Sequence, residues 1–226
     1  MSVAATFARD GIVVLPGFFS PEECVGANEF LDRCEQEADD RPFRNPADYA
    51  ERFATRVKGW TGIDDPGALA LADHERLAAV TTELLGSEFH SIYGTFAFGT
   101  PRGCSQGWHQ DTASTNPREF CLNRLIYPRS IGAAQGDLFS VPGSHVMDLP
   151  SGGNEDYIEG QERIAPTAGT VVLMHSRCFH RVGPNQTDDM RFMLNCRVQP
   201  RDAPLDLTDF ARFRSGTWQH SAAAPW

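Results

Sequence analysis

The chain has 226 residues and a formal net charge of −10 at neutral pH, with 41% hydrophobic and 22% charged residues. These values are typical of one globular domain with a full core. The acidic balance disfavours nucleic acid as a partner, because binding to phosphate requires a basic surface. The sequence shows neither an apolar run of membrane-spanning length nor a signal-peptide pattern, so a cytoplasmic protein without membrane contacts is expected.

The six cysteines are spread along the chain, and none of them forms a C-x-x-C pair with another. This spacing fits neither a zinc site nor a dense disulfide framework. We therefore expect reduced and mostly buried thiols.

The first third of the chain predicts one strand and two helices. The apolar run 12–15, closed by a Pro-Gly pair, predicts a strand. Residues 20–23 (S-P-E-E) form a capping-box pattern, which predicts a helix from Ser20 to about Glu37. A second helix is predicted over about 66–85, with Gly86 as its C-terminal stop. Residues 38–64 are polar, and the stretch 52–60 fits a helix or a strand.

From residue 89 onward, short β-rich runs alternate with Gly and Pro turns. These runs are 89–98, 120–127, 137–141, 170–175 and 192–198. Many short strands of this kind indicate a sandwich or a barrel. We predict a single domain over 1–226 that is mainly β with flanking helices. Its helices (about 20–86) pack on a β core (about 89–200), and a tail (201–226) follows.

Two segments of the chain resist assignment. Residues 148–166 are too long and polar for a hairpin turn, and loops of this length are usually functional or mobile. The tail ends in Trp218 and Trp226. Such late aromatic residues suggest that the tail packs on the body of the protein, although it could also wall a site or form a dimer contact.

The stretch Trp108-His109-Gln110-Asp111 carries the strongest chemical signal. On an extended strand, His109 and Asp111 point to the same face. His180 can add a third ligand. Two histidines and one carboxylate, with the other positions open, are the ligand set of non-haem Fe(II) oxygenases. His175 competes for the third place, but it ends an apolar run, whereas His180 follows at the turn.

Arg191 lies on the apolar run 190–194 and must be paired if it is buried. Its guanidinium could bind a carboxylate of a small co-substrate through two parallel hydrogen bonds. A structural salt bridge with an aspartate or glutamate is the alternative.

Several motifs occur in a characteristic order. They are F-x-x-D-G at the N-terminus, S-P-E-E, W-H-Q-D, G-D-L-F-S-V-P-G-S-H at 136–145, the run 169–174, and His180 followed by G-x-N and Arg191. With these motifs the chain resembles, from end to end, the phytanoyl-CoA dioxygenase family of Fe(II)/2-oxoglutarate oxygenases. The resemblance implies a double-stranded β-helix, which is a jelly-roll of cupin type. It makes His109, Asp111 and His180 ligands of Fe(II), and Arg191 the partner of the distal carboxylate of 2-oxoglutarate.

The implied activity is that of a dioxygenase that consumes O2 and 2-oxoglutarate, releases succinate and CO2, and oxidises a small-molecule metabolite. Halogenating relatives replace the carboxylate ligand with a small residue, so the intact Asp111 favours hydroxylation. Tyr127 could donate its hydroxyl to 2-oxoglutarate or simply fill the core. Gln135 departs from the family pattern, which often has Asn before the glycine. No catalytic residue beyond the metal ligands is expected.

Two other classes stay open: a cupin-type barrel that binds a metal or small ligand without turnover, and a zinc hydrolase. Loops 112–119 and 146–166 mix polar residues, which favours a small polar or natural-product-like substrate over a CoA thioester. Desaturation, epimerisation or ring closure could replace hydroxylation. His145 could line the pocket or pack at the barrel rim, Lys58 could reach the co-substrate or face solvent, and the oligomeric state is open.

Overall fold

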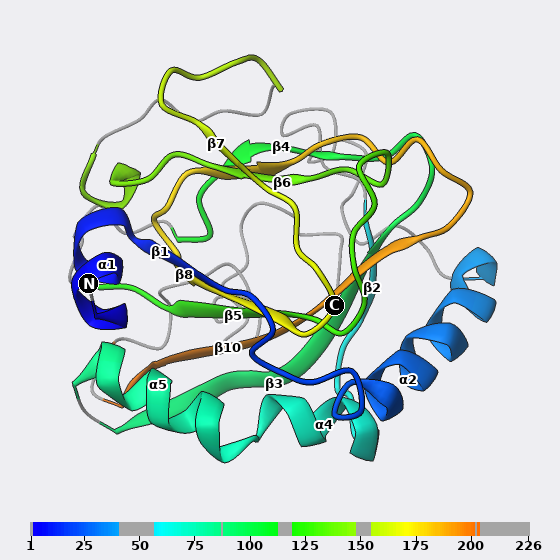
Figure 1. The fold of residues 1–226 in the computed structure, drawn as a ribbon, viewed down its shortest axis with the longest axis horizontal. Helices are drawn as coiled ribbons and strands as arrows, with labels where there is room; N and C mark the ends of the chain where they lie inside the picture. The colour runs from blue at the N-terminus through cyan, green and yellow to red at the C-terminus, as the bar shows by residue number, and fades with distance from the viewer. Residues whose placement is uncertain are drawn as a thin grey trace.

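The computed structural model describes residues 2–40, 57–86, 88–112, 119–147, 155–201 and 203. Two antiparallel sheets form the body of the protein (Figure 1). In spatial order, the larger sheet consists of β1 (Ile12–Leu15), β8 (Thr170–His175), β5 (Leu122–Tyr127), β10 (Arg191–Pro200), β3 (Phe89–Thr100) and β2 (Lys58–Trp60). The smaller sheet consists of β4 (Gln106–His109), β9 (His180–Val182), β6 (Leu138–Ser140) and β7 (Glu162–Ile164). This is a double-stranded β-helix, and the predicted fold class is confirmed.

The helices cover the larger sheet on its outer side. They are α1 (Val3–Asp10), α2 (Val25–Gln36), α4 (Pro66–Ala72) and α5 (Glu75–Leu85), with short 3₁₀ turns η1 (Ala38–Asp40) and η2 (Ser144–Val146). In Figure 1, α2, α4 and α5 lie below the larger sheet, while β4, β6 and β7 lie above it. One hydrophobic cluster joins the helices to the sheet, with Leu31, Leu71 and Leu77 from the helices and Leu173 and Phe192 from the strands.

The strands β8, β5 and β10 of the larger sheet are buried on both faces. On β8, Val171 and Leu173 pack toward the helices, whereas Val172 and Met174 pack into a second cluster between the sheets. Such double burial explains why these strands appear in the sequence as unbroken apolar runs. On β10 the side chains at 191, 193, 195 and 197 line the space between the sheets. Because successive side chains of a strand point to opposite faces, β10 places two arginines and an asparagine inside the barrel.

The capping-box prediction is only partly right. The Glu23 N–H donates to Ser20 Oγ at 3.3 Å and the Ser20 N–H donates to Glu23 Oε2 at 2.7 Å, as the pattern requires. However, residues 21–24 form a turn, and α2 begins only at Val25. The Cys24 N–H is shared between the carbonyls of Ser20 and Pro21, so the box closes a tight turn instead of the first turn of the helix.

The prediction of one helix over 66–85 is wrong, because α4 and α5 are separate helices. His74 has an extended backbone (φ −62°, ψ 134°), and its Nδ1 accepts a hydrogen bond from the Arg76 N–H. The imidazole accepts from a backbone N–H in the first turn of α5 that has no partner within the helix, so α5 starts as a new helix at this point. Gly86 ends α5 in the left-handed region (φ 64°), as predicted.

The six predicted strands are present as β1, β3, β5, β6, β8 and β10. The helix α1 and the short strands β4, β7 and β9 were not among the predicted elements, and β7 lies within the presumed loop 148–166. The end of the open stretch 52–60 forms β2. Residues 41–56, 113–118, 148–154 and 204–226 lie outside the described residues, together with the expectations for the tail.

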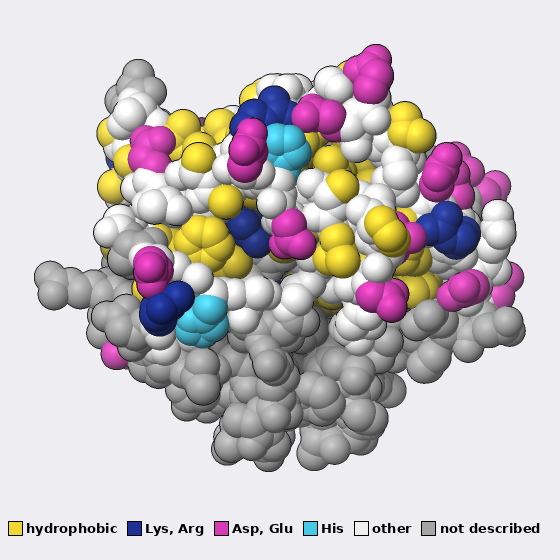
Figure 2. Space-filling model, turned by 90° about the horizontal axis from the view of Figure 1, so that it is seen from below, with side chains coloured by type: hydrophobic (Ala, Val, Ile, Leu, Met, Phe, Trp, Pro, Cys, Tyr) yellow, Lys and Arg dark blue, Asp and Glu magenta, His cyan; other side chains and the backbone are white. Residues whose placement is uncertain are grey.

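Figure 2 shows the face that carries the helices. On its described part, acidic and hydrophobic side chains are interspersed, and the few Lys and Arg side chains lie apart from one another. Within the described ranges, no helix combines the length and the apolar character needed to cross a membrane.

Gly136 allows two chain segments to approach closely, and its carbonyl binds a side chain inside the barrel. Its φ of 88° is in the left-handed region, and a Cβ atom there would lie 2.2 Å from the carbonyl oxygen of Gly183. The Gly136 carbonyl in turn accepts a hydrogen bond of 2.8 Å from Nε of Arg191. Only glycine permits both this backbone conformation and this close approach of two chain segments.

We expect Gly136→Ala to destabilise the protein by more than about 1 kcal/mol, because a Cβ in this conformation is strained even without the clash. Urea unfolding measures the loss. Gly132→Ala is the matched control, since its Cβ would meet only the flexible Gln135 side chain at 3.4 Å or more. Equal stabilities of the two variants would contradict the prediction.

Candidate metal centre

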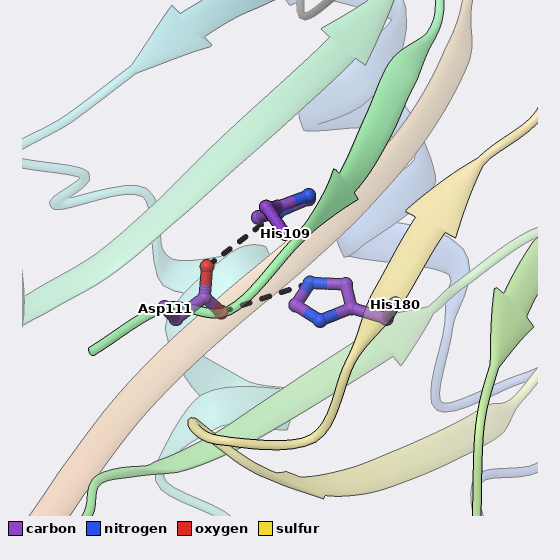
Figure 3. A group of neighbouring side chains, drawn as sticks. All are labelled: His109, Asp111 and His180. Atoms are coloured by element: carbon purple, nitrogen blue, oxygen red, sulfur yellow. Dashed lines mark ion pairs between the residues drawn. The ribbon is translucent and has the colours of Figure 1, made fainter. Parts of the chain in front are cut away.

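Three potential ligands converge at one end of the barrel (Figure 3). His109 ends β4 and His180 begins β9, and the two residues are opposite each other in an antiparallel pair. Asp111 follows β4, and its backbone N–H donates to the Ser176 carbonyl at 2.7 Å. Nε2 of His109 is 3.6 Å from Asp111 Oδ1, and Nε2 of His180 is 3.8 Å from Asp111 Oδ2. The structure thus brings together the three residues that the sequence singled out.

The spacing of these atoms suits a single ion. One ligating atom from each of the three side chains lies within 4.8 Å of the other two. Metal–ligand bonds to nitrogen and oxygen are about 2.0–2.2 Å long. An ion placed between the three groups would therefore need only small movements of the side chains to contact all of them.

Backbone carbonyls orient both imidazoles. Nδ1 of His109 lies 2.7 Å from the Gly107 carbonyl, and Nδ1 of His180 lies 2.9 Å from the Cys178 carbonyl. A carbonyl can only accept a hydrogen bond, so each Nδ1 carries the proton. Each Nε2 consequently directs a lone pair toward the centre of the cluster, which is the tautomer that a metal ligand requires.

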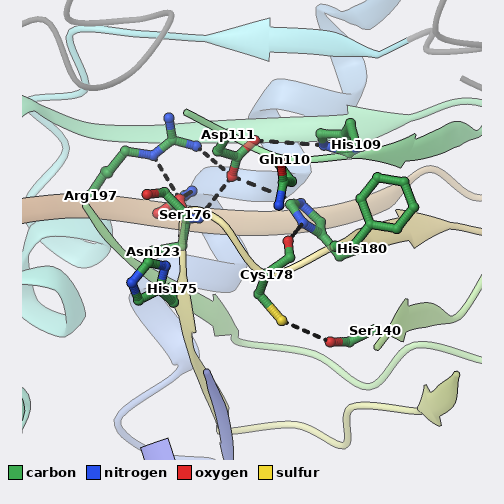
Figure 4. Close-up of polar contacts among 12 residues, drawn as sticks. His109, Gln110, Asp111, Asn123, Ser140, His175, Ser176, Cys178, His180 and Arg197 are labelled. Atoms are coloured by element: carbon green, nitrogen blue, oxygen red, sulfur yellow. Dashed lines mark hydrogen bonds and ion pairs between the residues drawn. The ribbon is translucent and has the colours of Figure 1, made fainter. Parts of the chain in front are cut away.

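A polar network surrounds Asp111 (Figure 4). Its Oδ2 accepts hydrogen bonds from Asn123 Nδ2 at 2.7 Å and from Arg197 Nη2 at 2.9 Å. Burial opposes ionisation of this carboxyl, but the charge of Arg197, together with the two histidines and Asn123, lowers the pKa of Asp111 to about 2. Burial, reinforced by His109, lowers the pKa of His180 to about 4. At neutral pH these two groups are therefore an anion and a neutral imidazole, the forms that bind metals.

His175 lies apart from the cluster. Its ring stacks on Phe120 with centroids 4.1 Å apart, and its Nδ1 accepts a hydrogen bond from the Arg177 N–H. His145 is buried beside it, with ring centroids 5.1 Å apart, and its carbonyl accepts from Arg177 Nε. Of the two candidates for the third ligand, the structure places His180 beside His109 and Asp111, while His175 packs in the wall of the barrel.

Arg191 is a buried cation with neutral partners. Its side chain is 2% exposed and lines the same pocket as the three potential ligands. Nε donates to the Gly136 carbonyl at 2.8 Å, and Nη2 donates to the Tyr127 hydroxyl at 3.2 Å. Within the described part of the chain, no carboxylate lies within ion-pair distance of Arg191. A buried charge without a counter-ion is costly, so this arrangement favours binding of an anion.

The remaining lining of the pocket is largely apolar. It includes Phe98, Leu125, Leu138, Met174, Val182 and Met193. These side chains line the pocket that the metal cluster shares with Arg191, and apolar walls of this kind strengthen electrostatic interactions in the pocket. Lys58 is not part of this lining, and its Nζ donates to the Ala38 carbonyl at 2.7 Å.

Sequence reasoning missed the contacts of Asn123 and Arg197 with Asp111. One signal was available for Arg197. It lies six positions after Arg191 on the same strand, and an even spacing places two side chains on the same face of a strand. The contact of Asn123 depends on how β5 pairs with β10, where Asn195 is opposite Leu125, and the sequence does not specify this register.

Comparison with known proteins identifies the family. The family model described as "Phytanoyl-CoA dioxygenase (PhyH)" matches residues 7–193. The chain belongs to the phytanoyl-CoA dioxygenase family. The resemblance seen in its motifs is thereby confirmed. No curated protein matches the chain significantly.

Solved structures share the fold at low sequence identity. The epimerase SnoN from nogalamycin biosynthesis, in complex with Fe3+, alpha ketoglutarate and nogalamycin RO, is 20% identical, with a TM-score of 0.68 over 88% of this chain and 82% of that one. HygX from Streptomyces hygroscopicus, with nickel, 2-oxoglutarate and hygromycin B bound, is 15% identical, with a TM-score of 0.66 over 87% and 85%. The carbocyclase SnoK, also from nogalamycin biosynthesis, is 19% identical, with a TM-score of 0.67 over 89% and 85%.

We expect the imidazole of His180 in the metal-free protein to titrate with a midpoint near 4, well below the usual value for histidine, because burial disfavours its charged form. Nuclear magnetic resonance of the histidine side chains, titrated between pH 3.5 and 8, measures the midpoint. The signal is assigned by its absence in His180→Gln. A midpoint above 6 would contradict the buried and neutral state described here.

Proposed function

We propose that the protein is an Fe(II)- and 2-oxoglutarate-dependent oxygenase that oxidises a small-molecule metabolite. The observation that carries the proposal is the pairing, in one pocket, of a His-Asp-His cluster with a buried arginine that has no carboxylate partner among the described residues. A metal-binding barrel without turnover has no need of that arginine. A dicarboxylate co-substrate needs both, since one end can bind the metal and the other the guanidinium.

The donor set fits Fe(II). Two neutral imidazoles and one carboxylate, with further positions open, are the ligands of non-haem Fe(II) oxygenases. We propose that His109, Asp111 and His180 hold the ion. The bound ion would supply activation of O2, which oxidises a C–H bond of the substrate while 2-oxoglutarate is converted to succinate and CO2. SnoN and HygX were solved with a metal and this co-substrate bound, which supports the same cofactors here.

The residues of the chain would bind and orient the co-substrate. Arg191 would pair with its distal carboxylate, and the Tyr127 hydroxyl, which accepts from Arg191, has its own hydrogen available for the same carboxylate. The apolar side chains that line the pocket would exclude water from the reacting groups. Binding at two fixed ends would restrict the co-substrate to one orientation before the substrate enters.

Hydroxylation is the reaction type that we propose. The carboxylate ligand Asp111 is present, and in the halogenating relatives this position is occupied by a small residue. The shared fold of an epimerase and a carbocyclase indicates that one scaffold can accommodate different outcomes. The bound molecules nogalamycin RO and hygromycin B in the structural neighbours support a small natural-product-like substrate, as the polar loops of the sequence suggested.

Anaerobic addition of Fe(II) and 2-oxoglutarate to the metal-free protein tests the proposal directly. A visible charge-transfer band that saturates at one equivalent is expected, because a 2-oxo acid that chelates Fe(II) absorbs in this range. Iron binding without the band would reject the co-substrate and favour a metal-binding barrel or a hydrolase.

Asp111→Ala should abolish the conversion of 2-oxoglutarate to succinate, because it removes the only anionic ligand of the cluster. Circular dichroism should show that the fold is retained. Succinate production at the wild-type rate in this variant would show that Asp111 is not a ligand.

Arg191→Gln should weaken 2-oxoglutarate binding about 30-fold or more, since the loss of a buried charged partner costs about 2 kcal/mol at least. Tyr127→Phe removes one hydrogen bond and should weaken binding about fivefold. Titration of the charge-transfer band gives both affinities. An affinity of Arg191→Gln equal to that of the wild type would exclude Arg191 from this role.

A further inference from the structure

The two oxygens of Asp111 have different surroundings. Oδ2 accepts one hydrogen bond from Asn123 and one from Arg197, which occupies both of its lone pairs. Oδ1 lies 3.6 Å from Nε2 of His109, and the described residues offer it no hydrogen-bond donor. The lone pairs of Oδ1 are therefore the ones available to an ion.

The distances to the two histidines alone do not distinguish the two oxygens of Asp111. Oδ2 is 3.8 Å from Nε2 of His180, which is close to the 3.6 Å between Oδ1 and His109. Both oxygens thus face the ligand cluster, and a carboxylate in this position could bind an ion through one oxygen or through both. The hydrogen bonds to Oδ2 decide between these modes.

A second layer of contacts fixes the two donors. Asn123 Oδ1 accepts from Arg197 Nε at 2.6 Å and from Asn195 Nδ2 at 3.0 Å. Because the oxygen of Asn123 is held by these donors, its amide NH2 must face Asp111. The three residues are 0–3% exposed, so water does not compete for these contacts. Figure 4 shows Arg197 reaching both Asn123 and Asp111.

The number of open coordination positions gives this arrangement a function. An Fe(II) ion held by two histidines and one carboxylate oxygen would keep further positions open, as in other sites of this ligand set. A 2-oxo acid that binds through two atoms would occupy two of them and leave one for O2. If Asp111 used both oxygens, the co-substrate would take the last two positions and none would remain.

We propose that Asn123 and Arg197 are positioning residues that restrict Asp111 to metal binding through Oδ1 and thereby keep a coordination position open for O2. This inference rests on the proposed oxygenase function. The inference assigns two properties of the site to different residues. Binding of 2-oxoglutarate depends on Arg191, whereas binding of O2 depends on the network around Asp111.

Nitric oxide tests the proposal, because it binds Fe(II) at the position that O2 needs and gives a distinct electron paramagnetic resonance signal. The variants are Arg197→Met and Asn123→Ala, each of which removes one donor to Oδ2. Both should still form the charge-transfer band with Fe(II) and 2-oxoglutarate. Their affinity for nitric oxide in that complex should fall at least tenfold, and Arg197→Lys should partly restore it.

The matched control is Arg124→Met. Arg124 is also a buried arginine, on the neighbouring strand β5, but its Nε donates to the Cys196 carbonyl and its guanidinium lies over Phe89. This control should bind nitric oxide like the wild type. A merely structural role of Arg197 predicts equal effects of Arg124→Met and Arg197→Met. If Arg197→Met does not fold, Asn123→Ala, which removes the other donor to Oδ2, provides the same comparison with the control.

The outcomes separate the two proposals. A wild-type protein without the charge-transfer band would contradict the oxygenase function. A wild-type band together with wild-type nitric oxide affinity in the folded variants would overturn the positioning role alone. Infrared spectra of the zinc-loaded protein give an independent measurement, since one-oxygen binding by Asp111 should show a wider splitting of its carboxylate stretches than in Arg197→Met. Equal splittings would also overturn the positioning role.

Discussion

The interior of this β-barrel contains charges, and the structure depends on how they are paired. Asp111, Arg191 and Arg197 lie in the space between the two sheets, where an isolated charge would be strongly unfavourable. Arg197 and Asp111 form an ion pair, and Asn123 satisfies further hydrogen bonds of both. Arg191 differs, because the partners described for it are a carbonyl and a hydroxyl. The site thus combines a closed electrostatic network at one end with an open one at the other.

This asymmetry links stability to function. The closed network can be formed during folding, without any ligand, and it determines the orientation of Asp111 in advance. The open position at Arg191 leaves part of the cost of burying a charge unrelieved until an anion binds. Binding of an anion, such as the proposed dicarboxylate, would remove that cost. A ligand that binds only the folded state also stabilises it.

Much of this arrangement could be predicted from the sequence, because strands convert spacing directly into direction. The two-residue spacing of His109 and Asp111 predicted a shared face, and the apolar runs predicted β3, β5, β6, β8 and β10. The missed strands β4, β7 and β9 are only three or four residues long, and their sequences (Q-G-W-H, E-R-I and H-R-V) contain no apolar run. The break at His74 was missed because an imidazole cap has no distinctive pattern. Contacts such as that of Asn123 with Asp111 require the pairing register, which the sequence does not contain.

The net charge of the chain does not describe the charge inside the barrel. A total of −10 disfavoured nucleic acid, a polyanion, as a partner. Inside the barrel the balance is reversed, since two arginines and one aspartate line the same pocket. In a pocket with apolar walls, these nearby charges act through a low effective dielectric, while the surface charges are screened by water and salt. The potential inside the pocket is therefore set by Arg191, Arg197 and Asp111 and not by the net charge, and its positive excess is compatible with the proposed dianionic co-substrate.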